Sequence, residues 1–321
     1  MAVAVAARPL AQPEQQQQQE AADATYFFTL YITLSIPSQP QTQMQMLILA
    51  QRKLLHPNQL PDHRRTALAR KPHGESRSRH DPPSKHSEGT TTGGANWVGY
   101  LTTAENASLV LSYNMAIGGA TVDNTLVKGV DGDLVSQVKT FGDAYASKPE
   151  TAPWTAENAV FGFWIGINDI GAAYSSTDAK TFIPQLTARI ASLWEDIYKV
   201  GGRKFLILNV PPTSRSPLFL GQGEETVQKH AAYLAAYNEQ VAAMVEGFKG
   251  EHEGVTTVVY DSWTFMTSVL DNPTDSGFPD ATCINEDGTS CIWWNDYHPS
   301  AKYQGLQAGD MKGVLKGLGG W

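Results

Sequence analysis

Residues 160–210, VFGFWIGINDIGAAYSSTDAKTFIPQLTARIASLWEDIYKVGGRKFLILNV, contain the pattern that decides the fold. The stretch opens with an apolar run at 160–165, and a second apolar run at 205–210 ends it. Between the runs, apolar residues recur mostly in steps of three and four, at Phe182, Ile183, Leu186, Ile190, Leu193 and Ile197. This periodicity predicts an amphipathic helix, which Gly201-Gly202 would stop. The stretch therefore predicts a strand, a helix and a further strand.

The same alternation extends to both sides of this stretch. Residues 109–116 (LVLSYNMA) and 255–260 (VTTVVY) are apolar runs that predict strands, and Asp261 is well placed to cap a following helix. A second long helix is indicated by Val227, Ala231, Leu234, Val241, Val245 and Phe248. Strands that are near-continuous apolar runs and alternate with helices predict a parallel sheet covered on both faces. In such sheets the ligand site lies at the carboxyl ends of the strands.

Distinctive polar or glycine residues follow three of the predicted strands. Gly118-Gly119, Asn168-Asp169 and Asn209 each occupy such a position. A glycine backbone N–H can be approached closely because no Cβ intrudes, and an asparagine amide is a second donor. Donors that converge on one point form an oxyanion hole, which stabilises the charge that develops in acyl transfer. Each feature alone is more often a plain turn or a helix cap, so the prediction depends on their combination.

A histidine near the C-terminus could supply the base for such chemistry. The stretch at 295–299 reads NDYHP, so His298 has an Asp or Asn close by. A histidine with such a partner can act as a general base with its orienter, although a lone histidine beside aromatic residues is more often structural.

Residues 1–86 differ in composition from the rest of the chain. They hold 10 Lys/Arg against 6 Asp/Glu, whereas the remainder holds 14 against 26, within a net charge of −8 for the 321 residues. A glutamine run at 15–19 and a Pro/His/Arg-rich stretch show no sustained period beyond two apolar runs, 26–36 and 46–50. We therefore divide the chain into a low-complexity segment, 1–90, and a folded domain, 91–321. The segment is either a disordered arm or a mis-assembled part of the reading frame, and we favour the second.

Charge, cysteines and hydropathy limit the partners. The acidic body argues against nucleic acid, which needs clustered Lys/Arg, and no run reaches the length of a membrane-spanning helix. Cys283 and Cys291 suit a small disulfide-closed loop in an oxidising compartment, or else two reduced thiols. The chain as written carries no convincing export signal, and Asn106-Ala107-Ser108 is a weak glycosylation sequon.

Several motifs together resemble the fungal acetylesterases of the SGNH/GDSL hydrolase superfamily, the group classed as carbohydrate esterase family 16. They are NMAIGGATVDNTLV, FWIGINDIG, NVPP and WWNDYHPS, and the resemblance runs from about Gly94 to the C-terminus. It implies a flavodoxin-like three-layer α/β/α sandwich and a secreted enzyme that removes acetyl groups from carbohydrates or small esters without metal or cofactor. By matching position, Gly119 and Asn168 would bind the oxyanion and His298 would be the base. Gly118 would support the turn, and Asp169 would fix the Asn168 loop.

Two departures from the family pattern concern the nucleophile and the partner of the histidine. The family's G-D-S block, whose serine is the nucleophile, does not occur, and its strand is missing or replaced by 26–36 or 46–50. The nearest imitation, Gly74-Glu75-Ser76, follows residues that cannot form a buried strand. The common D-x-x-H pattern would place an acid where Asn295 stands, so we predict Asp296 as the partner of His298.

Three functions follow. The first is a secreted acetylesterase of which residues 1–90 are wrongly assembled. The second is an inactive relative that keeps the fold and binds acetylated carbohydrate. The third is a nucleotide- or phosphate-binding protein, but the chain has neither G-x-x-x-x-G-K-[ST] nor G-x-G-x-x-G.

Overall fold

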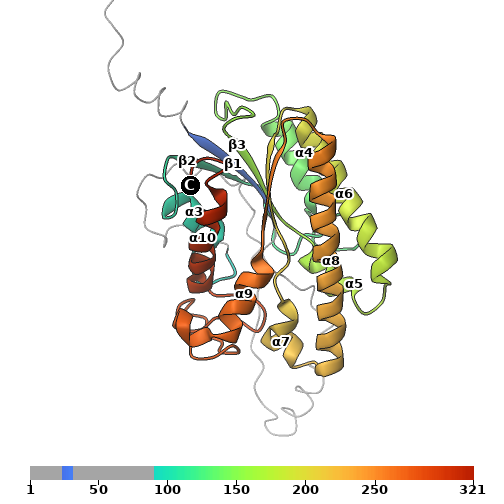
Figure 1. Cartoon of the computed structure of the whole chain (residues 1–321), viewed down its shortest axis with the longest axis vertical. Coiled ribbons are helices and arrows are strands. Elements are labelled where there is room, and N and C mark those ends of the chain that lie inside the picture. Colours follow the sequence, from blue (N-terminus) through green and yellow to red (C-terminus); the bar gives the residue numbers. More distant parts are fainter. Residues whose placement is uncertain (1–23, 32–89) are drawn as a thin grey trace, which may run out of the picture.

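The computed structural model of the protein describes residues 24–31 and 90–321. Within this part of the chain, five strands form one sheet in the order β2-β1-β3-β4-β5, and every neighbouring pair is parallel. The strands are β1 (Thr25–Tyr31), β2 (Val110–Asn114), β3 (Ala159–Trp164), β4 (Lys204–Leu208) and β5 (Thr256–Tyr260). Helices lie on both sides of the sheet (Figure 1), so the predicted three-layer α/β/α sandwich is confirmed.

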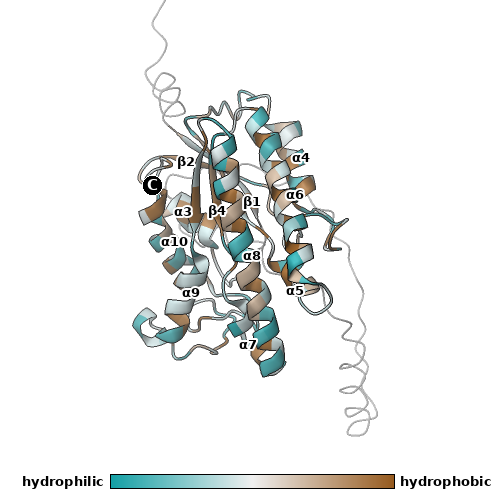
Figure 2. Cartoon of the chain, turned by 45° about the vertical axis from the view of Figure 1, so that its right-hand side comes forward, coloured by the Kyte–Doolittle hydropathy of each residue, from teal (hydrophilic) through white to brown (hydrophobic). Residues whose placement is uncertain are grey.

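The helices form two groups. One face of the sheet is covered by α4 (Leu134–Ala144), α6 (Ala179–Lys199) and α8 (Glu224–Glu251), and the other by α3 (Trp97–Thr103) and α10 (Ala301–Leu315). The shorter elements follow strand ends: α5 (Ile167–Ala173), η2 (Thr213–Arg215), α7 (Pro217–Leu220), α9 (Ser262–Asp271) and η3 (Pro273–Ser276). Helices α4, α6 and α8 carry both hydrophilic and hydrophobic residues (Figure 2), as expected of helices with one buried face.

Alternation along the strands builds a separate core on each face. In β4, Phe205 and Ile207 belong to the core that includes α4, α6 and α8, whereas Leu206 and Leu208 belong to the core that includes α3 and α10. All four side chains are at most 1% exposed. A strand buried on both faces must be a near-continuous apolar run, which is why the sequence pattern identified it.

The predicted strands are found within one or two residues of their expected bounds, and the two predicted helices extend two or three residues beyond the apolar positions that indicated them. The runs at 109–116, 160–165, 205–210 and 255–260 form β2, β3, β4 and β5. The two predicted helices are α6 and α8, and Asp261 caps α9 by accepting from Thr264 N, as predicted. In residues 24–31 and 90–321 no helix is long and apolar enough to span a membrane.

The division of the chain at residue 90 needs one correction. Residues 25–31 form β1, an interior strand between β2 and β3, so part of the segment that we set apart as low-complexity belongs to the domain. Phe28 is fully buried, with its ring centroid 5.3 Å from that of Phe161 and 5.0 Å from that of Tyr113. Burying such a side chain contributes about 1.5–3 kcal/mol, which explains why this apolar run pairs into the sheet. The run at 46–50 lies outside the described residues.

Candidate active site

The polar residues singled out in the sequence lie at one edge of the sheet. Gly118-Gly119 follow β2, Asn168-Asp169 follow β3 and Asn209 follows β4, and the three strands run parallel. Their carboxyl ends therefore share an edge. Since β1 lies between β2 and β3, its carboxyl end at Tyr31 lies between the ends of these two strands.

Gly119 forms the second half of a turn that begins at Gly118. Its φ is +83°, a left-handed conformation that strains any residue with a Cβ. Gly119 is buried whereas Gly118 is exposed. The turn thus needs glycine at position 119 for its backbone conformation, and it brings the Gly119 backbone amide to the strand end.

Asn168 joins the β3 end to this turn. It lies in the first turn of α5, is 3% exposed, and donates from Nδ2 to Ala120 O at 2.9 Å. A carboxamide nitrogen carries two N–H groups, so this bond leaves one for a ligand. Asn168 Oδ1 has no hydrogen-bond partner within the described part of the chain. The structure therefore brings Asn168 and the glycine turn together, as the prediction of an oxyanion hole requires.

The position of Asn168 depends on a tight start to α5. Gly166 precedes the helix with a φ of +104°, and a Cβ placed there would lie 2.2 Å from Tyr237 Cζ. Tyr237 is 1% exposed and donates from Oη to Ile165 O at 2.9 Å. The glycine of GIND is therefore required both by its backbone conformation and by the close approach of Tyr237.

Asp169 ties the same helix to the chain beyond the glycine turn. It is fully buried, and its two carboxyl oxygens lie 3.1 and 3.2 Å from Val122 N, which donates to them. Burial raises the pKa of Asp169 to about 7, and the nearby Asp123 and Asp133 also raise it. Asp169 thus contacts the backbone of the loop that carries Gly119.

Asn209, the third strand-end residue, is engaged in structural bonds. Its Nδ2 donates to Asp261 Oδ1 at 2.8 Å, and its Oδ1 accepts from Trp263 N and from Ser262 Oγ, both at 3.0 Å. These bonds join the end of β4 to the start of α9. Asn209 therefore braces the edge of the sheet, because both its amide nitrogen and its amide oxygen are bonded to the start of α9.

His298 precedes α10 and is held by Asn295. Asn295 Oδ1 accepts from Tyr297 N at 2.9 Å and from His298 N at 2.7 Å, and it lies 3.0 Å from His298 Nδ1. Two backbone N–H groups that point at this atom identify it as the amide oxygen, which can only accept. His298 Nδ1 must then carry the proton, which leaves Nε2 as the basic nitrogen. Nε2 has no hydrogen-bond partner among residues 24–31 and 90–321.

Asp296 does not make the contact that we predicted. It is exposed, and its backbone oxygen accepts from Leu218 N at 2.8 Å, whereas Asn295 makes the contact to the imidazole. The turn at 295–298 places the side chain three residues before the histidine beside the ring, so the adjacent carboxylate is directed elsewhere. The D-x-x-H spacing points to position 295 as the partner of the histidine. We predicted Asp296 because it carries a charge, whereas the structure places Asn295 beside the ring.

The pKa of His298 is low because the side chain is buried and no carboxylate of a described residue contacts the ring. The side chain is 9% exposed, and burial lowers its pKa to about 4. A neutral amide fixes the tautomer of an imidazole but does not stabilise imidazolium as a carboxylate does. His298 is therefore neutral, and available as a base, from mildly acidic pH upwards.

The His298 loop lies at the same edge as the other site residues. The bond from Leu218 N to Asp296 O joins it to α7, which follows β4, and the ring of Tyr297 lies 6.0 Å from that of Phe219 in α7. The ring of Phe219 in turn lies 5.9 Å from that of Tyr174, at the end of α5. These contacts connect His298 to the helix that carries Asn168.

The two remaining predictions concern the nucleophile and the binding of metal. Ser76, the weak candidate for the nucleophile, is not among the described residues. In residues 24–31 and 90–321 no cluster of His, Cys, Asp or Glu could hold a metal ion.

Comparison with known proteins identifies one family. Residues 74–309 match the model of the GDSL-like lipase/acylhydrolase family. The chain is 40% identical over 232 residues to an acetylesterase of Thermothelomyces thermophilus, covering 71% of this chain and 77% of that protein. It is 24% identical over 275 residues to an acetylesterase of Hypocrea jecorina, covering 71% and 78%.

Similar solved structures include an acetylxylan esterase from Geobacillus stearothermophilus. It shares 14% sequence identity with a TM-score of 0.45, covering 92% of this chain and 94% of that chain.

Proposed function

The chain belongs to the GDSL-like lipase/acylhydrolase family, a family of ester hydrolases, and we propose that it removes acetyl groups from carbohydrates or other small esters. Support for the acetyl group comes from the two acetylesterase relatives. Support for the chemistry comes from the edge of the sheet, where donors and a base are gathered.

In the proposed site the donors bind the oxyanion and His298 is the base. Gly119 N–H and the second N–H of Asn168 Nδ2 stabilise the negative charge on the acetyl oxygen. His298 Nε2 takes the proton of the attacking hydroxyl and returns it to the leaving alcohol, while Asn295 fixes the ring. The acetyl group is then bound to the attacking oxygen as an ester. A water molecule, which gives its proton to His298 Nε2, attacks this ester; acetate leaves, and the proton passes to the freed hydroxyl oxygen. The observation that carries the proposal is the bond between Asn295 Oδ1 and His298 Nδ1, because it leaves Nε2 basic.

The proposed position of the nucleophile is the chain that follows β1. A serine there would emerge between the ends of β2 and β3, between Gly119 and Asn168. The residues after Tyr31 lie outside the description, and the sequence contains no G-D-S. Transcript reads across residues 1–90 test our proposal that this region is wrongly assembled: we expect them to join a G-D-S segment to the domain, and reads that match the written sequence would oppose it.

We also propose that the protein is secreted, with residues 91–321 and β1 as its catalytic domain. The disulfide between Cys283 and Cys291 supports an oxidising compartment. Thiol titration of the denatured protein, with and without prior reduction, should give two and no free thiols respectively. Two thiols without reduction would contradict this compartment.

A fluorophosphonate probe tests the proposed chemistry on protein purified from the corrected reading frame, which carries the G-D-S segment. We expect it to label one serine covalently and to abolish hydrolysis of 4-nitrophenyl acetate and of acetylated xylooligosaccharide. His298→Ala should react much more slowly, whereas Lys139→Ala, an exposed residue of α4, should react normally. A protein that binds acetylated oligosaccharide but is labelled at no serine would instead be an inactive relative.

A further inference from the structure

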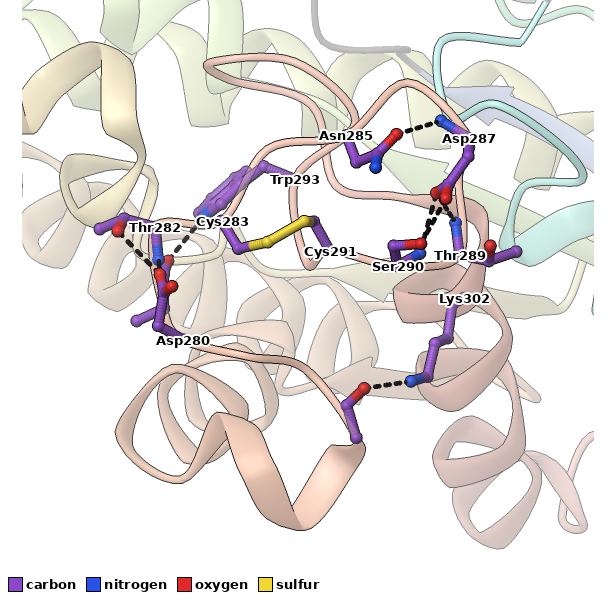
Figure 3. Close-up of a disulfide and its surroundings, with 12 residues drawn as sticks. Asp280, Thr282, Cys283, Asn285, Asp287, Thr289, Ser290, Cys291, Trp293 and Lys302 are labelled. Atoms are coloured by element: carbon purple, nitrogen blue, oxygen red, sulfur yellow. Dashed lines mark hydrogen bonds between the residues drawn. A yellow bond between two sulfur atoms is a disulfide. The ribbon is translucent and has the colours of Figure 1, made fainter.

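The disulfide between Cys283 and Cys291 closes a small loop (Figure 3). The chain that follows this loop leads into the His298 segment. Residues on the two sides of the disulfide are also joined through the backbone. Trp293 N donates to Cys283 O at 3.2 Å, and Asn285 N donates to Trp293 O at 3.0 Å. The covalent bond and the hydrogen bonds therefore align residues 283–285 with residues 291–293.

The opposite side of this segment carries the catalytic histidine. Ser300 N donates to Ile292 O at 2.8 Å, and Trp294 N donates to His298 O at 2.7 Å. Isolated bridges pair Trp293 both with Ile284 and with Pro299. Residues 292–294 are thus the middle of a three-segment layer, with the disulfide on one side and His298 on the other.

The layer is also fixed to the rest of the domain. Trp293 is fully buried in a core with residues of α9 and α10, and its Nε1 donates to Ala281 O at 2.8 Å. Lys302 contacts two of the surrounding loops, because its backbone N donates to Gly288 O at 2.9 Å and its Nζ donates to Gly277 O at 2.5 Å (Figure 3). The disulfide therefore lies within a supported layer and is not an isolated link at a loose loop.

We propose that the Cys283–Cys291 disulfide is a positioning element for the proposed base, holding the segment against which the His298 turn is hydrogen-bonded. A cross-link removes the alternative conformations that the eight-residue separation would otherwise allow. Without it, residues 283–285 can move away from Trp293, and the turn at 294–298 loses one of its supports. The inference rests on the proposed role of His298, and its test reads the histidine directly, without turnover.

The test compares the oxidised protein, the reduced protein and the double variant Cys283→Ser/Cys291→Ser. The first readout is hydrogen exchange of the amides of Trp294 and Ser300, which we expect to be at least tenfold faster without the disulfide. The second is the pKa of His298 by NMR, assigned with His298→Gln. Burial holds this pKa at about 4, so a loosened turn that admits water should raise it by one unit or more. Reoxidation should restore both values.

Ile284→Ser is the matched control. Ile284 lies inside the same loop, is 48% exposed and leaves the disulfide intact, so neither readout should change. Exchange at the amides of α6 separates local from global effects, and we expect it to stay within threefold. Unchanged values at Trp294, Ser300 and His298 after complete reduction would overturn the inference, and so would an equal loss of protection in α6. If the histidine responds but no variant hydrolyses esters, the proposed function fails and the positioning role remains.

Discussion

Replacing Asn295 by aspartate should convert the neutral partner of His298 into a charged one with little change in shape. Asn295 Oδ1 lies 3.0 Å from His298 Nδ1, and a carboxylate oxygen there can still accept from Tyr297 N and His298 N. An opposite charge at this distance favours imidazolium and raises a histidine pKa by about 1–3 units. The pKa of about 4 in the native protein should therefore rise to between about 5 and 7 in Asn295→Asp.

The proposed base, His298, would work in its neutral form, so the acid limb of the pH profile should move with its pKa. We expect kcat/KM of Asn295→Asp to fall at a higher pH than that of the native enzyme. The Cε1 proton of His298 should titrate with the same shift by NMR, whether or not ester is turned over. Asn295→Ala removes the oxygen without adding a charge. This variant should lose activity, but no new charge is present to raise the pKa of His298. An unchanged His298 pKa in Asn295→Asp would refute the assignment of Asn295 as the residue that faces the ring.

Three further predictions concern the stability of the folded domain. Gly166→Ala places a Cβ 2.2 Å from Tyr237 Cζ and should lower the free energy of unfolding by about 3 kcal/mol or more. Gly171→Ala, in the same helix with nothing within 4 Å, should raise it by about 0.5–1 kcal/mol; equal urea midpoints for the two would contradict the geometry. Burial lowers the pKa of His230 to about 3, below its unfolded value, so stability is lost as pH falls below about 6.5. Between pH 7 and 4.5 the free energy of unfolding of His230→Leu should therefore fall by about 2–3 kcal/mol less than that of the native protein. An unchanged pH dependence of the urea midpoint in this variant would count against the prediction. Asp169 has its pKa raised to about 7, so its ionisation costs stability as pH rises from about 4 to about 7. Between pH 5 and 8 the free energy of unfolding of Asp169→Asn should therefore fall by about 2–3 kcal/mol less than that of the native protein. Thermal melts that show equal losses for the two proteins would exclude a cost from the ionisation of Asp169.

Local sequence patterns were sufficient to predict most of the sheet and the edge at which the candidate site lies. The strands at 160–165 and 205–210 follow from near-continuous apolar runs, because both faces of these strands are buried. The helix between them follows from its periodicity, because it buries one face. β1 was harder to predict. Its partners lie at 110–114 and 159–164, and a short apolar run does not reveal with which distant segment it pairs.

The choice between Asn295 and Asp296 also depended on conformation. Both residues are polar neighbours of His298, and a carboxylate is the better partner for imidazolium, so chemistry alone favoured Asp296. The backbone turn decides otherwise, because the N–H groups of Tyr297 and His298 converge on Asn295 Oδ1. Such a turn is set by the bonds around it and cannot be read from residue types.

The most direct test of the site is the effect of Asn168→Ala on kcat/KM for 4-nitrophenyl acetate. Loss of one oxyanion donor should lower kcat/KM by about 10²–10³-fold. The melting temperature should fall by only a few degrees, because the bond to Ala120 O contributes about 1 kcal/mol. A folded variant that hydrolyses the ester within threefold of the native rate would show that Asn168 does not bind the oxyanion and would contradict the proposed site.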